Sequence, residues 1–186
     1  MIRLVVDEEI TLALREEHHA AETAALVERN RAYLREWLPW VDHCYEEEDF
    51  LKNIRLNRSQ HAQKAGLNLG IWYRNILSGM IGFHHFDHTH RKTSLGYWLT
   101  EDLQGNGIVT RATRFLVNYA FEELEMNRLE IRCAEHNRSS RAIPERLGFN
   151  EEGRLRQSQI VGGEYQTMVI YGMLKRDWST LKTQER

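Results

Sequence analysis

Two glycines lie one residue apart between an apolar segment and a helical pattern, in the run Gln104-Gly105-Asn106-Gly107-Ile108. Glycine adopts positive backbone φ angles readily and lets a ligand approach the main chain closely. The first-turn N–H groups of the following helix have no partners within that helix, and the helix dipole adds a partial positive charge. This order of elements predicts an anion site that suits a phosphate or pyrophosphate.

Two familiar phosphate-binding loops do not match this segment. The dinucleotide fingerprint needs three glycines and an acidic residue about 20 positions later, and this chain lacks that pattern. A Walker A loop ends in Gly-Lys followed by Ser or Thr, and no such motif follows Gly107. The glycine pair alone also fits an ordinary structural turn, so the surrounding motifs decide its interpretation.

The composition is typical of one soluble domain. The chain has 186 residues, of which 41% are hydrophobic and 28% charged. No apolar run approaches the length of a membrane span and no signal-peptide pattern opens the chain, so we expect no membrane association. The net charge of −2, with no basic face, predicts no direct binding to nucleic acid. The two cysteines form no disulfide framework, which favours a reducing, cytoplasmic location.

Hydrophobic periodicity predicts the secondary structure. We expect a hairpin or bent strand over 4–14 and helices over 20–38, 46–65, 108–124 and 140–147. Strands are expected over 67–73, 77–86, 94–99, 129–133, 153–161 and 164–174. Cys133 falls on an apolar strand face and is expected in the core, Gly148 caps the last helix, and Gly162-Gly163 close a hairpin.

The resulting order, β-α-α-β-β-β-α-β-α-β-β, predicts an α+β fold with a mixed, mostly antiparallel sheet. The glycine loop lies between a central strand and the long helix of this order. Residues 1–175 are expected to form a single domain, and residues 176–186 a loose C-terminal tail.

The chain resembles the GNAT superfamily of N-acetyltransferases. Gln104 and Gly107 match its signature, Gln/Arg-x-x-Gly-x-Gly/Ala, and Val109 holds the last small position. Five further motifs occur in order along the chain, the first of them before the loop: Leu-Gly-Tyr-Trp-Leu at 95–99, Arg-Leu-Glu-Ile-Arg-Cys at 128–133, Asn137-x-x-Ser140, Leu-Gly-Phe at 147–149 and Glu-Gly-Arg-Leu-Arg at 152–156. Together they resemble the ribosomal-protein N-terminal acetyltransferases of the Rim type over nearly all of residues 1–175.

This resemblance implies the GNAT fold, with splayed central strands that bind acyl-CoA, and acetyl-CoA as the co-substrate without a metal. The strand ending in Trp98 and Leu99 would pair with the pantetheine, and a backbone N–H near Leu99 would bind the thioester carbonyl. Asn137 and Ser140 would lie near the pantetheine and the sulfur. The resemblance assigns the CoA pyrophosphate to the backbone of Gln104, Gly105, Asn106, Gly107, Ile108, Val109 and Thr110.

The acid and the base depart from the family pattern. Many relatives protonate the leaving thiolate with a tyrosine at the position of Pro144, so Ser140 becomes the candidate acid here. Ser140 could equally cap the short helix, and because proline has no N–H, we expect that helix to start late or to kink. Rim-type sequences often carry a glutamate where this chain has Gln159, a candidate acceptor contact that cannot take a proton. Glu130 is another candidate base, but because it lies on an alternating strand we expect a structural role for it.

Four histidines and an aspartate lie within residues 84–90, and these are ligand types that transition metals use. Neighbouring strand residues point to opposite faces, so His84 and His85 cannot easily share an ion. We therefore expect solvated histidines and no metal site, although one of them could act as a base or line the amine slot.

The predicted function is direct transfer of acetyl from acetyl-CoA to an amine in a ternary complex. The preferred acceptor is the N-terminal α-amine of a protein, particularly a ribosomal one. Its ordinary pKa of about 7.7–8.0 leaves part of it neutral near pH 7 without a carboxylate base, unlike lysine at about 10.4. A small amine (polyamine or aminoglycoside) as acceptor, or a non-catalytic acyl-CoA-binding module, stays open. Family members often dimerise, so a homodimer is one expected assembly.

Overall fold

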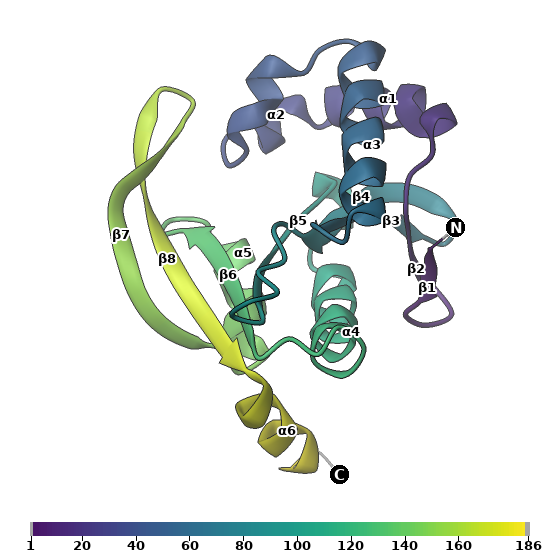
Figure 1. Cartoon of the computed structure of the whole chain (residues 1–186). Helices are drawn as coiled ribbons and strands as arrows, with labels where there is room; N and C mark the ends of the chain where they lie inside the picture. The colour runs from purple at the N-terminus through teal and green to yellow at the C-terminus, as the bar shows by residue number, and fades with distance from the viewer. Residues whose placement is uncertain (1, 185–186) are drawn as a thin grey trace.

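The computed structural model describes residues 2–184. Its eight strands form one sheet in the order β1-β2-β3-β4-β5-β6-β8-β7. Helices α1 and α3 cover one face of the sheet and α4 covers the other (Figure 1). The strands are β1 (Arg3–Val5), β2 (Ile10–Ala13), β3 (Leu67–Tyr73), β4 (Ile76–Phe83), β5 (Lys92–Leu99), β6 (Arg128–Ala134), β7 (Asn150–Val161) and β8 (Glu164–Leu174). The helices are α1 (Ala20–Arg29), α2 (Arg31–Leu34), α3 (Glu47–Ala62), α4 (Ile108–Glu122), α5 (Arg138–Arg146) and α6 (Lys175–Gln184).

The sheet splits between β5 and β6, which form its parallel pair. Their pairing runs only from Lys92–Arg128 to Leu95–Ile131. β5 stays paired with β4 as far as Leu99, and β6 stays paired with β8 as far as Ala134. The ends of β5 and β6 therefore diverge while each keeps its outer neighbour (Figure 1). This confirms the predicted mixed sheet with splayed central strands.

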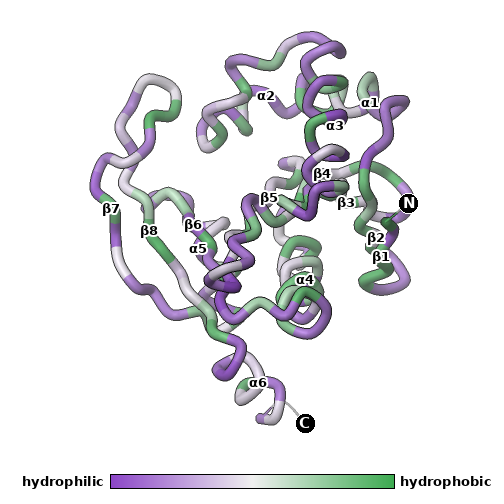
Figure 2. The backbone as a smooth tube through the Cα atoms, viewed as in Figure 1, coloured by the Kyte–Doolittle hydropathy of each residue, from purple (hydrophilic) through white to green (hydrophobic). Residues whose placement is uncertain are grey.

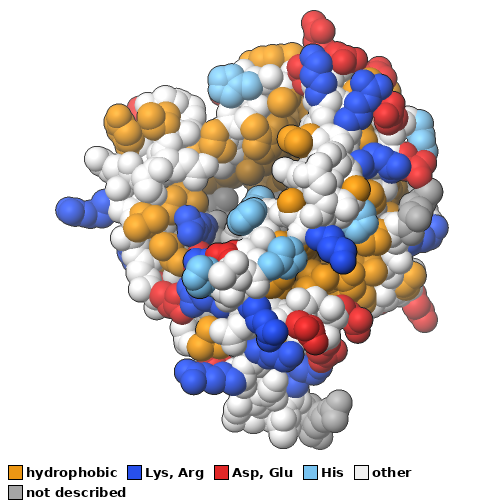
Figure 3. Space-filling view, viewed as in Figure 1, with side chains coloured by type: hydrophobic (Ala, Val, Ile, Leu, Met, Phe, Trp, Pro, Cys, Tyr) orange, Lys and Arg blue, Asp and Glu red, His pale blue; other side chains and the backbone are white. Residues whose placement is uncertain are grey.

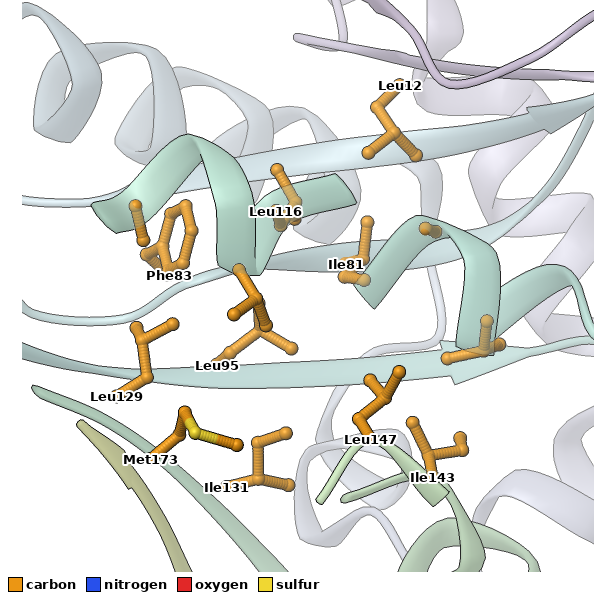
Figure 4. Close-up of a cluster of buried hydrophobic side chains, with 14 of the residues drawn as sticks. Leu12, Ile81, Phe83, Leu95, Leu116, Leu129, Ile131, Ile143, Leu147 and Met173 are labelled. Atoms are coloured by element: carbon orange, nitrogen blue, oxygen red, sulfur yellow. The ribbon is translucent and has the colours of Figure 1, made fainter. Parts of the chain in front are cut away.

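Two apolar clusters hold the layers together. The larger one packs α4 against the sheet, with Leu116 facing Ile81, Phe83 and Leu95 (Figure 4). Hydrophobic positions recur along α4, as its burial against the sheet requires (Figure 2). The smaller cluster lies under the α1–α3 layer and comprises Val27, Leu34, Val41 and Phe50.

Most predicted elements are confirmed, and the two main differences lie in the helix predicted over 20–38 and in the C-terminal tail. The expected helix over 20–38 breaks at Asn30, whose side chain donates to the Leu26 carbonyl and accepts from the Glu101 N–H. Such side-chain bonds compete with the helix ladder. The β7–β8 hairpin closes at Gly162 and Gly163 with φ angles of 57° and 84°, as predicted.

The prediction of a loose C-terminal tail over residues 176–186 is wrong for residues 176–184, which belong to α6; residues 185 and 186 lie outside the described part. Trp178 is only 4% exposed, and its indole N–H donates to Asn118 Oδ1 on α4 at 2.8 Å. Trp178 and Leu181, three residues apart, share one helix face and both pack on the core. Within residues 2–184, no helix is long and apolar enough to cross a bilayer.

Candidate active site

A cavity of about 1170 Å³ opens where β5 and β6 diverge. Its walls come from both halves of the sheet, the α1–α3 layer, the start of α4 and the start of α5. In the space-filling view, hydrophobic side chains border a hollow on this face, and histidine side chains lie beside it (Figure 3). The cavity is the one place where all but one of the predicted site residues meet.

The glycine loop forms one end of the cavity. Gly105 and Gly107 have φ angles of 78° and 70°, a left-handed conformation that favours glycine. A Cβ atom on either glycine would meet no atom within 4 Å, so the space above the loop is open. The first helix-type bond of α4 runs from the Arg111 N–H to the Gly107 carbonyl at 3.0 Å, which leaves the N–H groups of residues 108–110 available. These features fit an anionic group such as a pyrophosphate.

The predicted loop residues mostly line the cavity. Those that do are Gln104, Gly105, Gly107, Ile108, Val109 and Thr110. Asn106 is not among the lining residues. Its side-chain amide donates to the carbonyls of Leu103 and Gln104, at 3.0 and 3.3 Å, and thereby braces the loop.

Arg146 brings a positive charge to this loop. Its guanidinium donates to Thr110 Oγ1 at 3.1 Å and lines the cavity. The arginine lies in the last turn of α5, whereas Thr110 lies in the first turn of α4. No local pattern in the sequence points to Arg146, because only the packing of α5 against α4 brings the two residues together.

The diverging edge of β5 forms the middle of the cavity. Trp98 and Leu99 line it, and pairing with β6 has already ended at Leu95. In an antiparallel strand, alternate backbone groups face opposite neighbours, so half of those in residues 96–99 face away from β4. They are available to a ligand that runs along this edge.

Ser140 is not the helix cap, contrary to one of the two roles considered for it. α5 starts earlier than expected, at Arg138, and Asn137 caps it by accepting the Ser140 N–H at 3.0 Å. The Ser140 hydroxyl donates instead to Cys133 Sγ at 3.2 Å. Asn137, Ser140 and the buried Cys133 all line the cavity.

Pro144 lies inside α5, and the helix continues through it. A residue with an N–H at this position would donate to the Ser140 carbonyl, four residues earlier. Proline cannot, and the Tyr97 hydroxyl donates to that carbonyl at 2.9 Å. Burial raises the pKa of Tyr97 well above its ordinary value, so the phenol stays protonated as a donor.

Gln159 and Glu130 have the environments that the sequence suggested. Gln159, on β7, lines the cavity. Glu130 forms ion pairs with Arg128 and Arg132, both at 3.0 Å, which supports the structural role expected for it.

Among the histidines of residues 84–90, His84 lines the cavity. A Cβ atom built on Gly96 would lie 2.5 Å from His84 Nε2, so the imidazole sits over the start of the diverging part of β5. The His84 residue is exposed to solvent, but the protein atoms crowded around its imidazole partly desolvate the ring and lower the pKa of His84 from its ordinary value. His88 Nε2 contacts the Lys64 carbonyl at 2.7 Å, and His90 pairs with Asp87 at 3.1 Å. Within residues 2–184, no cluster of three or more His, Cys, Asp or Glu is placed to hold a metal.

A family model described as an acetyltransferase (GNAT) domain matches residues 10–150. The chain belongs to this family. The acetyltransferase is 40% identical over 179 residues to YdaF of Bacillus subtilis, provisionally assigned as a ribosomal N-acetyltransferase, across 96% of this chain and 98% of YdaF. It is 28% identical to a ribosomal-protein-serine acetyltransferase of Escherichia coli, across 91% of this chain and 94% of the relative.

The acetyltransferase also matches solved structures over nearly its whole length. One is RimL, a ribosomal-protein α-N-acetyltransferase solved with coenzyme A in disulfide linkage to a cysteine. The two share 25% identity with a TM-score of 0.91, over 95% of this chain and 99% of RimL. The protein is therefore an N-acetyltransferase with the GNAT fold, as its sequence motifs predicted.

Proposed function

We propose that this acetyltransferase transfers the acetyl group of acetyl-CoA to the N-terminal α-amine of a protein, and that this acceptor is a ribosomal protein. The observation that carries the proposal is the opening between β5 and β6, which leads from the free N-terminus of α4 into one cavity. The named activities of YdaF, the Escherichia coli enzyme and RimL support this class of acceptor. We further propose that the protein acts in the cytoplasm and that a homodimer is one assembly.

The glycine loop would hold the pyrophosphate of CoA through the backbone of residues 104–110, with Arg146 adding a positive charge. The pantetheine would follow the open edge of β5 at Trp98 and Leu99. Bound acetyl-CoA supplies an activated thioester carbonyl. A backbone N–H near Leu99 would stabilise the negative charge that develops on the carbonyl oxygen when the amine attacks.

Ser140 would deliver a proton to the departing thiolate. Its hydroxyl already donates to a sulfur, Cys133 Sγ, and Asn137 and Tyr97 hold its backbone from two sides. Gln159 would contact the acceptor from the opposite wall.

We propose His84 as the base that takes the proton from the amine. The residues that line the cavity, as far as the chain is described, include no Asp or Glu. His84 is the lining residue whose ordinary pKa lies near neutrality. Because burial lowers its pKa, its imidazole is neutral at pH 7 and can accept a proton.

The charges of the cavity favour a peptide over a polyamine. Arg15, Arg132 and Arg146 line the described wall, and no carboxylate does. A polyamine carries several positive charges that would find no counter-charge in such a cavity. A peptide N-terminus needs to present only one amine, which reacts in its neutral form.

The test compares two peptides of equal length, assayed by release of CoA thiol. One has a free N-terminus and no lysine, and the other has a blocked N-terminus and one lysine. We expect transfer to the free N-terminus, because at pH 7 the neutral fraction of an α-amine is roughly a tenth and that of lysine below about 0.1%. Faster transfer to the blocked peptide, or to spermidine, would show that the acceptor class is wrong.

A further inference from the structure

Arg15 is a buried arginine in the wall of the cavity. It follows β2 and is only 4% exposed. Its Nη2 atom donates to Asn53 Oδ1 at 2.8 Å, and its Nη1 atom donates to Thr23 Oγ1 at 3.4 Å. Its Nε atom is buried without a hydrogen-bond partner in the described part of the chain. Both partners of the guanidinium are therefore neutral, and the Nε–H donor is unused.

The charge of Arg15 is unbalanced. Burial lowers the pKa of its guanidinium to about 10, and no neighbouring carboxylate raises it again. The group is therefore still positively charged at neutral pH. A buried charge without an opposite charge is costly unless a ligand supplies one. The missing negative charge is thus expected from a molecule that enters the cavity.

Neighbouring residues connect Arg15 to the part of the cavity beside β5. Asn68, on β3, also lines the cavity, and its Oδ1 atom is buried without a hydrogen-bond partner in the described residues. Asn68 pairs with Gly82 on β4, which pairs with Gly96 on β5 beneath His84. The two glycines place no side chain on the sheet between Asn68 and β5. An acceptor amine beside His84 therefore belongs to a molecule that can extend across the sheet toward Arg15.

We propose that Arg15 binds an anionic group of the acceptor, namely a carboxylate carried close to the amine that is acetylated. The proposal rests on the proposed function, since it names the class of peptide that enters the same cavity. A guanidinium with an unused Nε donor can bind a carboxylate through two parallel hydrogen bonds. Asn68 Oδ1 is available to a backbone N–H of the same peptide.

The strand spacing indicates which residue carries the carboxylate. From β5 to β2 there are three steps of about 4.8 Å, or roughly 14 Å, and an extended peptide rises about 3.3 Å per residue. The length of the Arg15 side chain shortens this span. We therefore place the carboxylate on the second or third residue of the acceptor.

The experiment compares two free-N-terminus peptides without lysine that differ only in Asp or Asn at residues 2 and 3. For the wild-type enzyme we expect kcat/KM to be at least about tenfold higher for the Asp peptide. In Arg15→Met the ratio should fall to near one, while transfer to the Asn peptide stays within about threefold of wild type. The control is Arg55→Met on α3, which removes the same charge from an exposed ion pair with Glu17 and should keep the wild-type ratio.

Two results would overturn the proposal. The first is a wild-type Asp/Asn ratio near one. The second is an Arg15→Met enzyme that unfolds at lower temperature and loses activity equally with both peptides, because Arg15 would then serve only to join α1 and α3. If Arg15 carries an unpaired buried charge, its replacement by methionine should leave the unfolding temperature at the wild-type value or raise it.

A parallel series with a free amino acid and its amide separates this proposal from the proposed function. If peptides are not acetylated but the amino acid is preferred over its amide, and Arg15→Met abolishes that preference, the Arg15 site stands and the peptide acceptor is wrong. If peptides are acetylated without regard to charge, the Arg15 site alone is wrong.

Discussion

The hydrogen bond from Tyr97 to the Ser140 carbonyl depends on Pro144, and this dependence can be measured. The hydroxyl donates to the Ser140 carbonyl, which a backbone N–H at residue 144 would otherwise bind. Tyr97→Phe removes the hydroxyl that donates to this partly buried carbonyl, and leaving such a group unpaired costs about 1–3 kcal/mol of unfolding free energy. Pro144→Ala restores the N–H. In that background Tyr97→Phe should cost only about 0.5–1.5 kcal/mol, the net value of one hydrogen bond.

Pro144→Ala by itself should stabilise the protein. Inside a helix, proline lowers the free energy of unfolding by about 3 kcal/mol relative to alanine. Proline also restricts the unfolded chain, which offsets up to about 1 kcal/mol of this loss. The expected gain is thus about 2 kcal/mol. The four proteins of the cycle (wild type, the two single variants and the double variant) are compared by urea unfolding, and the coupling should be about 0.5–1.5 kcal/mol.

Turnover provides a second measure of the same contact. Tyr97→Phe should lower kcat more than it raises the KM for acetyl-CoA, since it loosens the turn that carries the Ser140 hydroxyl. Pro144→Ala should recover part of this loss in the double variant. A coupling within about 0.3 kcal/mol of zero, with equal kcat in both Tyr97→Phe backgrounds, would refute this account of Pro144.

Three further predictions concern the cavity between β5 and β6. Acetyl-CoA at 100 times its dissociation constant should stabilise the protein by about 2.7 kcal/mol and raise its unfolding temperature. Gly107→Asp should abolish this shift, because it fills the open space above the loop with a negative side chain. A shift retained in Gly107→Asp would contradict the loop assignment. Ser140→Ala should lower kcat while the acetyl-CoA shift stays the same, with little loss of stability because Asn137 is the cap; unchanged kcat would exclude Ser140 as the acid. The rate of acetyl transfer should rise with pH as the His84 imidazolium loses its proton, with a midpoint below the ordinary pKa of 6.5. His84→Gln should remove this rise from the pH–rate profile. A His84→Gln profile identical to that of the wild type would exclude His84 as the base.

Local patterns predicted the parts of the site that depend on one segment at a time. The glycine loop could be recognised because positive φ is a property of glycine itself, and the helix after it because apolar residues recur at helical spacing. The hairpin at Gly162-Gly163 and the buried Cys133 follow from equally local signals. The alternation of the strands, with the family motifs, was enough to predict a mixed sheet that opens at its centre.

Other features depended on which segments meet in space. The register of β4 against β5 selects His84 from its neighbouring histidines, because it places that ring over Gly96. The packing of α5 on α4 brings Arg146 to Thr110, and the docking of Trp178 on α4 turns an expected tail into α6. Arg15 looks like any charged residue in the sequence, and only the layer of α1 and α3 above it makes it a buried, unbalanced cation. The sequence determined the glycine loop and the strand that we propose for acetyl-CoA, since both are local features. The arginines and the imidazole that line the cavity, which we propose to face the acceptor, come together through long-range contacts and were decided by the tertiary structure.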